Sequence, residues 1–277
     1  MTGRECREFL QWALPRLRLR WAGFRKVQGQ VCKRLARRLA ALGLENPAAY
    51  RSYLASHPAE WEALEHLSRV TISRFGRDRG VFEALSNVVL PRLARMALRE
   101  GSGIVSAWSA GCASGEEPYG LQAFWRLRVL PALGEDVGLR VLATDIDPRL
   151  LERARQGRYP ASSLKDLPED IRRQAFTPLA GGGVLLREEF RRDVVFLRQD
   201  IRRERPEGRF HLLLVRNLVF TYFEEGLQRE MLDVLTEKLL PGGYLVVGTH
   251  EKLPDGAEFS PASPAVFRKG DEKNGGR

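Results

Sequence analysis

The stretch "IVSAWSAGCASGEEPYG", residues 104 to 120, decides the fold class of this chain. Its first half, "IVSAWSA", is a short β-rich run, which predicts a strand. Gly111 and Gly115 follow, and glycine permits a sharp turn in which the backbone approaches a ligand closely. Pro118 suits the first turn of a helix. The stretch therefore predicts the strand, turn and helix of a site for a nucleotide-like cofactor.

The charged residues of this turn indicate the kind of cofactor. A phosphate ligand calls for lysine or arginine and for free backbone N–H groups, whereas this turn carries Glu116 and Glu117. Two carboxylates favour a ligand that is cationic or rich in hydroxyl groups. S-adenosylmethionine has a sulfonium, an ammonium and two ribose hydroxyls, and it has no phosphate. One glutamate has a structural alternative, because the dipole at a helix N-terminus also favours a carboxylate.

A second acidic residue strengthens this prediction. The run "VLATDIDPRLLERARQG" ends its apolar part at Asp145, about thirty residues after the glycine turn. Adenosine-binding folds place at that position the acid that accepts the ribose hydroxyls. We expect Asp147 to cap the helix that begins at Pro148 and ends at Gly157. Asp145 is therefore predicted to bind the ribose, and Asp147 to be structural.

The rest of the chain divides into two patterns. The first hundred residues carry apolar residues at helical spacing, with helix starts predicted at Asn46–Pro47 and His57–Pro58. Later β-rich runs alternate with amphipathic helices, which favours a parallel α/β sheet; these runs are "LRVLATDI", "VVFLRQ", "FHLLLVRN" and "GYLVVGTH". We predict a helical domain with its linker at 1–100, a cofactor domain at 101–269 and a frayed tail at 270–277.

Composition excludes several classes of protein. The chain has 277 residues and lacks both an apolar run of bilayer length and the apolar segment of a signal peptide, which predicts a cytoplasmic protein without membrane insertion. Cys6, Cys32 and Cys112 are odd in number and show no CxxC spacing, so reduced thiols are expected. The four histidines form no metal-binding motif, and no metal site is predicted.

The net charge of +10 is concentrated in the first forty residues. Their cations include Arg16, Arg18, Arg20, Arg25, Lys26, Lys33, Arg34, Arg37 and Arg38, and the acidic residues among them are Glu5 and Glu8. This density predicts an anionic partner, and a solvated helix face is the alternative. Nucleic acid fits the charge equally well, but no helix-turn-helix, zinc-finger or RNA-binding motif accompanies it, so we do not expect it as the partner.

Several motifs together carry a family resemblance. They are "QVCKRLARRLAALGL", "YRSYLASHP", "VTISRFGRD", "WSAGCASGEEPYG", "ATDIDPRLLERARQGRYPASSLKDLP", "RQDI", "FHLLLVRNLVFTYF" and "LLPGGYLVVGTHE". In this order they resemble the chemotaxis receptor methyltransferases, the CheR family, from about Phe9 to His250. The resemblance implies an α/β class I methyltransferase domain, with a Rossmann-like and mostly parallel sheet, preceded by a small all-helical domain. It also implies S-adenosylmethionine as cofactor, S-adenosylhomocysteine as product and glutamate γ-methyl esters on receptor helices.

The resemblance also implies roles for individual residues. Glu117 and Asp145 would hold hydroxyls or the ammonium of the cofactor, in the turn of Gly111 and Gly115. The remaining positions would be Asp200 and Ile201 at the adenine, Asn217 and Leu218 at the end of the fourth strand, Thr71, Ser73 and Arg77 in the linker over the methionine end, and Tyr222 near the methyl group. Arg77 and Tyr222 are the predicted catalytic residues.

Methyl transfer to a glutamate carboxylate depends more on positioning the reactants than on acid–base catalysis. A glutamate, with a reference pKa of about 4.3, is already an anionic nucleophile at neutral pH. Arg77 fits as a bidentate clamp for the carboxylate, and a surface pair with Asp78 is the alternative. Tyr222 is predicted to donate a hydrogen bond to the nucleophile or, alternatively, to pack its ring. A basic helix with Lys33, Arg34, Arg37 and Arg38 is expected to steer acidic receptor helices.

Two departures from the family pattern keep other functions open. Gly76 stands where the family has a second aromatic residue, which predicts a looser lid, and one residue is added between Asn217 and Tyr222. The alternatives are a methyltransferase of the same architecture that acts on a different acceptor, and a regulatory module that binds S-adenosylmethionine with little transfer.

Overall fold

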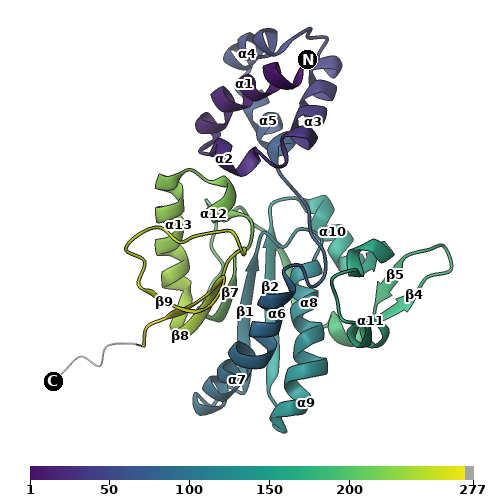
Figure 1. Ribbon diagram of the computed structural model, residues 1–277, viewed down its shortest axis with the longest axis vertical. Coiled ribbons are helices and arrows are strands. Elements are labelled where there is room, and N and C mark those ends of the chain that lie inside the picture. Colours follow the sequence, from purple (N-terminus) through teal and green to yellow (C-terminus); the bar gives the residue numbers. More distant parts are fainter. Residues whose placement is uncertain (272–277) are drawn as a thin grey trace. The chain divides into compact units, whose positions relative to one another are not determined.

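The computed structural model describes residues 1–271, which fold into two compact units (Figure 1). The first unit comprises Met1–Thr71 and Leu218–Arg229. The second comprises Ile72–Asn217 and the residues from Glu230 on. The helix α13, Glu225–Lys238, is divided between them.

The first unit is helical, as predicted. Its elements are α1 (Gly3–Ala13), η1 (Leu14–Leu17), α2 (Trp21–Phe24), α3 (Gln28–Ala41), α4 (Pro47–Ser56), α5 (Glu60–Ser68) and α12 (Val219–Tyr222). The Asn46 side chain accepts a hydrogen bond from the Ala49 N–H at 2.9 Å, which confirms the predicted cap of α4. The other predicted start is displaced, because α5 begins at Glu60, two residues beyond Pro58, without a side-chain cap.

The segment 218–229 completes this unit although it is distant in sequence. The Arg20 N–H donates to the Tyr222 carbonyl at 2.8 Å, and the Arg18 guanidinium pairs with Glu224 at 2.7 Å. Gly23 is required at this contact, since a Cβ there would lie 2.2 Å from the Thr221 carbonyl oxygen. Tertiary contact rather than chain order therefore defines the unit.

A disulfide joins Cys6 of α1 to Cys32 of α3, with the two Cα atoms 5.9 Å apart. The expectation of three reduced thiols was therefore wrong for these two residues. Sequence spacing could not reveal the pair, because the chain between them is folded into helices that bring positions 26 residues apart into contact. Cys112 is a buried free thiol, and burial, followed by the nearby carboxylates of Asp145 and Glu117, raises its pKa well above the usual value.

The second unit is built on a seven-stranded sheet, which confirms the predicted α/β class (Figure 1). Its strands are β1 (Ile104–Ala110), β2 (Gly138–Asp145), β6 (Val194–Arg198), β7 (Phe210–Leu214), β8 (Leu239–Val246), β9 (Phe259–Ser263) and β10 (Val266–Lys269). Their order is β6-β2-β1-β7-β8-β10-β9; the first five are parallel to one another, and β10 is antiparallel to both of its neighbours, β8 and β9. The chain leaves β1 towards β2 on one side and returns to β7 on the other, which creates a switch point at the carboxyl end of β1.

Helices flank this sheet. They are α6 (Arg79–Ala84), η2 (Leu85–Val89), α7 (Leu90–Arg99), α8 (Glu116–Phe124), η3 (Trp125–Val129), α9 (Leu130–Leu133), α10 (Pro148–Gln156), η4 (Ala161–Leu164), α11 (Glu169–Ala175) and η5 (Glu188–Phe190). The apolar face of α7 contacts β1.

The two compact units divide after Thr71, whereas the change from helical to β-rich pattern near residue 100 marks the start of the first strand. Helical periodicity is the same on both sides of that boundary, so it could not locate it.

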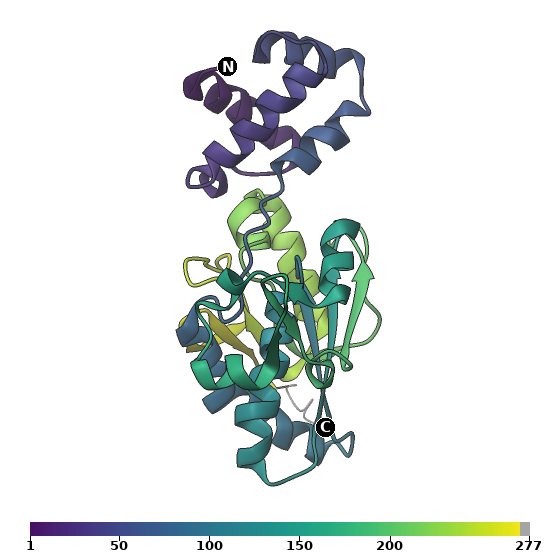
Figure 2. The same cartoon turned by 90° about the vertical axis from the view of Figure 1, so that its right-hand side faces the viewer.

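A small antiparallel sheet lies between β2 and β6 in the sequence and faces the viewer in Figure 2. It contains β3 (Arg158–Tyr159), β4 (Phe176–Pro178) and β5 (Val184–Leu186), and the glycines at 181–183 lie at the tip between β4 and β5.

Of the predicted tail, Gly270 accepts a hydrogen bond from the Gly242 N–H, and residues 272–277 lie outside the described residues. Within residues 1–271, no helix has both the length and the apolar character to cross a membrane.

Candidate cofactor site

The glycine turn after β1 is fixed to the end of β2. The N–H groups of Gly111 and Cys112 both donate to the Thr144 carbonyl, at 2.8 and 3.0 Å. Gly111, Ala113 and Gly115 have φ angles of 73°, 49° and 85°, a region that favours glycine. A Cβ on Gly115 would lie 2.9 Å from the Ala154 side chain, so packing of α10 also requires glycine there. The predicted turn thus lies at the switch point of the sheet.

Asp145 lies beside this turn at the end of β2. Its two carboxylate oxygens accept hydrogen bonds from the N–H groups of Ala113 and Asp147, both at 2.9 Å. A carboxylate oxygen can accept more than one hydrogen bond, so a backbone partner does not prevent it from binding a hydroxyl group. Asp147 accepts from the Arg149 N–H at 2.9 Å, which confirms its predicted role as the cap of α10. The carboxylate of Asp145 is therefore oriented by the backbone before any ligand arrives.

The two glutamates of the turn have different surroundings. Glu117 accepts hydrogen bonds from the Ser109 hydroxyl at 2.8 Å and from Arg216 at 3.1 Å. Glu116 is 3% exposed, is hydrogen-bonded to Ser73, and has one carboxylate oxygen without a partner among the described residues. Burial raises the pKa of Glu116, an effect that its hydrogen bonds and the charge of Arg153 oppose.

Arg216 is the residue that sequence reasoning missed. Its side chain is 4% exposed, and it pairs with Glu117 at 3.1 Å and with Asp78 at 2.7 Å. It also donates to the Arg77 carbonyl at 2.7 Å. A signal was present, because an arginine directly after the apolar strand β7 needs a buried anion. Arg216 therefore connects the segment before α6 to the helix that carries Glu117.

The segment before α6 carries the predicted Ser73 and Arg77. The Arg77 guanidinium donates to the Ile72 carbonyl at 3.0 Å, and the surface pair with Asp78 is not formed, since Asp78 binds Arg216. Gly76 has a φ of 66°, and a Cβ there would lie 2.9 Å from the Asp166 carbonyl oxygen. This position therefore admits no larger residue without displacing the backbone of residue 166, and the looser lid stays a prediction.

Asn217 follows β7 with a left-handed φ of 55°. Its N–H donates to Glu251 at 2.9 Å, and the Gly248 N–H donates to the same oxygen at 2.5 Å. Glu251, 8% exposed, is a second residue that the sequence did not single out. The predicted Leu218 is the next residue, and it begins the segment that belongs to the first unit.

Asp200 and Ile201 follow β6, the neighbour of β2. The Gln199 N–H donates to the Asp145 carbonyl at 3.1 Å, which places this loop beside the predicted ribose acid. The Arg202 guanidinium binds both oxygens of Asp200, at 2.9 and 2.7 Å. Burial disfavours the ionised form of Asp200, but these bonds outweigh it and lower the pKa. Ile201 is buried.

The structure thus brings one group of predicted residues together in the second unit, around the carboxyl ends of β1, β2 and β7. The group comprises Ser73, Arg77, Gly111, Gly115, Glu117, Asp145 and Asn217, with Asp200 and Ile201 in the adjoining loop. Thr71 and Tyr222 belong to the first unit, where the Tyr222 ring packs on Phe24 at 5.1 Å. The cofactor and catalytic roles of all these residues stay predictions.

The donor set fits S-adenosylmethionine. Asp145 presents a carboxylate already oriented by two backbone N–H groups, and Glu116 keeps a buried oxygen without a partner among the described residues. The turn itself contributes no lysine or arginine that would hold a phosphate. A parallel sheet with this turn and acid at its switch point defines the class, a Rossmann-like fold with a site for an adenosine-containing cofactor that has no phosphate at the turn.

Comparison with known families supports this class and narrows it. The family model described as "CheR methyltransferase, SAM binding domain" matches residues 71–265. The one described as "CheR methyltransferase, all-alpha domain" matches residues 27–66. The chain therefore belongs to the CheR methyltransferase family.

Curated relatives agree. The chemotaxis protein methyltransferase of Listeria monocytogenes is 33% identical over 204 residues, 72% of each chain. That of Salmonella typhimurium is 32% identical over 252 residues, 88% of this chain and 83% of the relative. Among solved structures, the N-methyltransferase NodS from Bradyrhizobium japonicum aligns with 62% of this chain and 63% of its own at 19% identity, with a TM-score of 0.31, too low to add to the assignment.

Proposed function

We propose that this methyltransferase forms glutamate γ-methyl esters on a receptor-like helical protein. The proposal is supported by the family and by relatives such as the chemotaxis protein methyltransferase of Listeria monocytogenes. The observation that carries it is the buried Arg216 bridge, which fixes the segment of Arg77 against the helix of Glu117. This bridge supports a role for Arg77 as the arginine that binds the acceptor carboxylate.

Bound S-adenosylmethionine supplies a methyl group on a positively charged sulfur that is its own leaving group. The residues of the chain bind and orient. Asp145 accepts the ribose hydroxyls on oxygens that the backbone has already aligned. No general base is needed, because a glutamate with a pKa of about 4.3 is ionised at neutral pH.

Arg77 orients the acceptor carboxylate in this proposal. Of the interactions that the structure describes, its guanidinium makes one, with the Ile72 carbonyl. The planar guanidinium presents five N–H donors in a geometry that matches a carboxylate, so further donors serve the acceptor. Orientation of this kind replaces acid–base chemistry as the main contribution of the protein.

The methyl-transfer assay that tests the proposal uses tritiated S-adenosylmethionine and membranes that contain a chemoreceptor. We expect label on the receptor that mild base releases as methanol, since carboxyl esters are base-labile. Membranes whose receptor carries alanine at its methylatable glutamates are the matched control, and they should stay unlabelled. Base-stable label would mean a different acceptor, and cofactor binding without any transfer would mean a regulatory module.

A further inference from the structure

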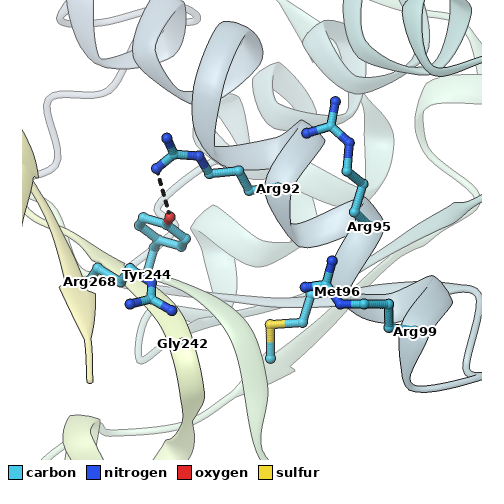
Figure 3. A pocket seen from close by; sticks show the side chains of 7 residues that line it. All are labelled: Arg92, Arg95, Met96, Arg99, Gly242, Tyr244 and Arg268. Carbon is cyan, nitrogen blue, oxygen red and sulfur yellow. Dashed lines mark hydrogen bonds between the residues drawn. The ribbon is translucent and has the colours of Figure 1, made fainter. Parts of the chain in front are cut away.

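The second unit contains a cavity of about 400 Å³ that shares no residue with the cofactor site. It is lined by Arg92, Arg95, Met96, Arg99, Gly242, Tyr244 and Arg268 (Figure 3). These residues come from α7, from β8 and from β10. The cofactor turn, in contrast, follows the carboxyl end of β1.

The helical repeat places three of the arginines together. Arg92, Arg95 and Arg99 are separated by three and four residues, so they follow one face of α7. Arg268 comes from the opposite wall, on β10, where it pairs in register with Tyr244 of β8 (Figure 3). Four guanidinium groups thus line one hollow. Arg92, Arg95 and Arg99 are exposed, so water screens part of their mutual repulsion, and an anion between them removes the rest.

The protein supplies little negative charge to balance them. Arg268 pairs with Asp271 at 2.6 Å, and Arg92 donates to the buried Tyr244 hydroxyl at 3.5 Å. Arg95 and Arg99 have no carboxylate partner within residues 1–271. Glu100, the next residue along the chain, is bound instead to His211 at 3.0 Å. The cavity therefore holds a surplus of positive charge.

We propose that this cavity binds a small anion that carries two or more phosphate groups. A guanidinium offers paired donors that match a phosphate, which explains arginine rather than lysine at all four positions. Arg92 and Arg99 lie seven residues apart, about 10 Å along the helix, which is more than one phosphate covers, so together they can contact separate phosphates of one anion. The volume is that of a small-molecule site, roughly 300 to 1,000 Å³, rather than of a flat nucleic-acid surface.

Gly242 supports this assignment. Its φ of 73° favours glycine, and a Cβ there would lie 3.0 Å from Asp271 and 3.2 Å from the Arg268 guanidinium. A side chain at this position would require the ends of both side chains to shift by a few tenths of an ångström. The small residue keeps that wall and its charged group in place.

Calorimetry with inorganic triphosphate tests the proposal on the full-length protein. We expect saturable binding with one site per chain, and a loss of affinity of about tenfold or more in the double variant Arg95→Gln/Arg99→Gln, because hydrogen bonds to charged groups are strong. The control is Arg4→Gln/Arg7→Gln, which removes the same charge from two exposed residues of α1. It should bind as the parent does, and both variants should keep the parent affinity for S-adenosylmethionine.

Three outcomes would overturn the proposal. One is no saturable binding of triphosphate by the parent, and another is an equal loss in the two double variants, which would indicate diffuse attraction by the net charge. The third is binding to vesicles of phosphatidylcholine with phosphatidylglycerol while free triphosphate fails to bind, which would identify a membrane surface as the anion. Weaker binding of orthophosphate than of triphosphate is the expected result for a site that spans several phosphates.

Discussion

At the scale of single residues, Asp145 is the acid that the structure prepares best, since two backbone N–H groups fix its carboxylate. We expect Asp145→Ala to weaken S-adenosylmethionine binding by about 1 to 3 kcal/mol, the range for hydrogen bonds to a charged group. Calorimetry measures the change. Asp147→Ala is the control: it should lower the free energy of unfolding by about 1 kcal/mol through the lost helix cap. Equal affinities in parent and Asp145→Ala would refute the ribose role.

Arg77 permits a test of the proposed carboxylate clamp. Arg77→Lys should keep the fold and the affinity for S-adenosylmethionine but lower the turnover number, because an ammonium loses the planar bidentate geometry. Steady-state methyl transfer measures it. Arg79→Lys, two residues away in an exposed pair with Glu83, should turn over like the parent. A normal rate for the Arg77 variant would return this residue to a structural role.

Glu116 gives a pH dependence. Its pKa is raised by burial, so the folded state binds this proton more tightly than the unfolded state. The free energy of unfolding then falls as pH rises from the unfolded pKa, about 4.3, through the folded one. We expect the stability of Glu116→Gln relative to the parent to grow across that window and to level off above it. Urea unfolding between pH 4 and 8 measures it. Glu45→Gln, at an exposed position, is the control. A difference in the free energy of unfolding between Glu116→Gln and the parent that stays constant or shrinks across this pH range would contradict the burial effect.

At the scale of elements, the structure divides the basic helix α3 into two parts. Arg38 binds both oxygens of Glu60 at 2.8 and 2.5 Å, and Arg34 donates to the carbonyls of Leu67 and Arg69. These two arginines therefore hold the first unit together, and the expectation that all four basic residues serve a partner is corrected. The exposed positions are Lys33 and Arg37.

The steering hypothesis therefore moves to these exposed residues. Lys33→Glu/Arg37→Glu should raise the KM for a receptor substrate and flatten its salt dependence, since exposed charges act over about 10 Å at 0.1 M salt. Initial rates at several salt concentrations measure both. Arg4→Glu/Arg7→Glu on α1 makes the same change in charge and should have a smaller effect. Identical effects would assign the attraction to net charge, and an unchanged KM would leave α3 as a solvated face.

At the scale of the whole molecule, the first unit is assembled from two distant parts of the chain. Phe220 and Phe223 are 1% and 5% exposed, and a bridge joins Leu19 to Phe223. The segment that follows Asn217 therefore depends on residues near the amino terminus for its burial.

This dependence predicts the outcome of a truncation. A chain that starts at residue 72 should melt about 6 to 12 °C below the full chain, because exposing a buried phenylalanine costs about 3 kcal/mol and each kcal/mol lowers Tm by about 2 to 4 °C at this size. Calorimetric scans measure it. The same truncation with Phe220→Ser/Phe223→Ser should show less aggregation. Equal Tm values for full and truncated chains would mean that the segment 218–229 needs no partner.

The sequence by itself determined the features that depend on neighbouring residues. Apolar runs located all five parallel strands, the Asn46 and Asp147 caps follow from local hydrogen bonding, and the glycine turn with Asp145 identified the class of cofactor. Strands can be recognised in short windows from their local pattern of apolar and β-branched residues, and caps and turns because their hydrogen bonds join residues a few positions apart. The family resemblance rests on such windows in order.

The tertiary structure alone decided which distant residues meet. It joined Cys6 to Cys32, placed Arg216 between Asp78 and Glu117, and moved the unit boundary to Thr71. It also decided which arginines of α3 are bound and which are exposed. These contacts depend on how helices and strands pack, and packing brings together positions whose separation in the chain carries no periodic signal.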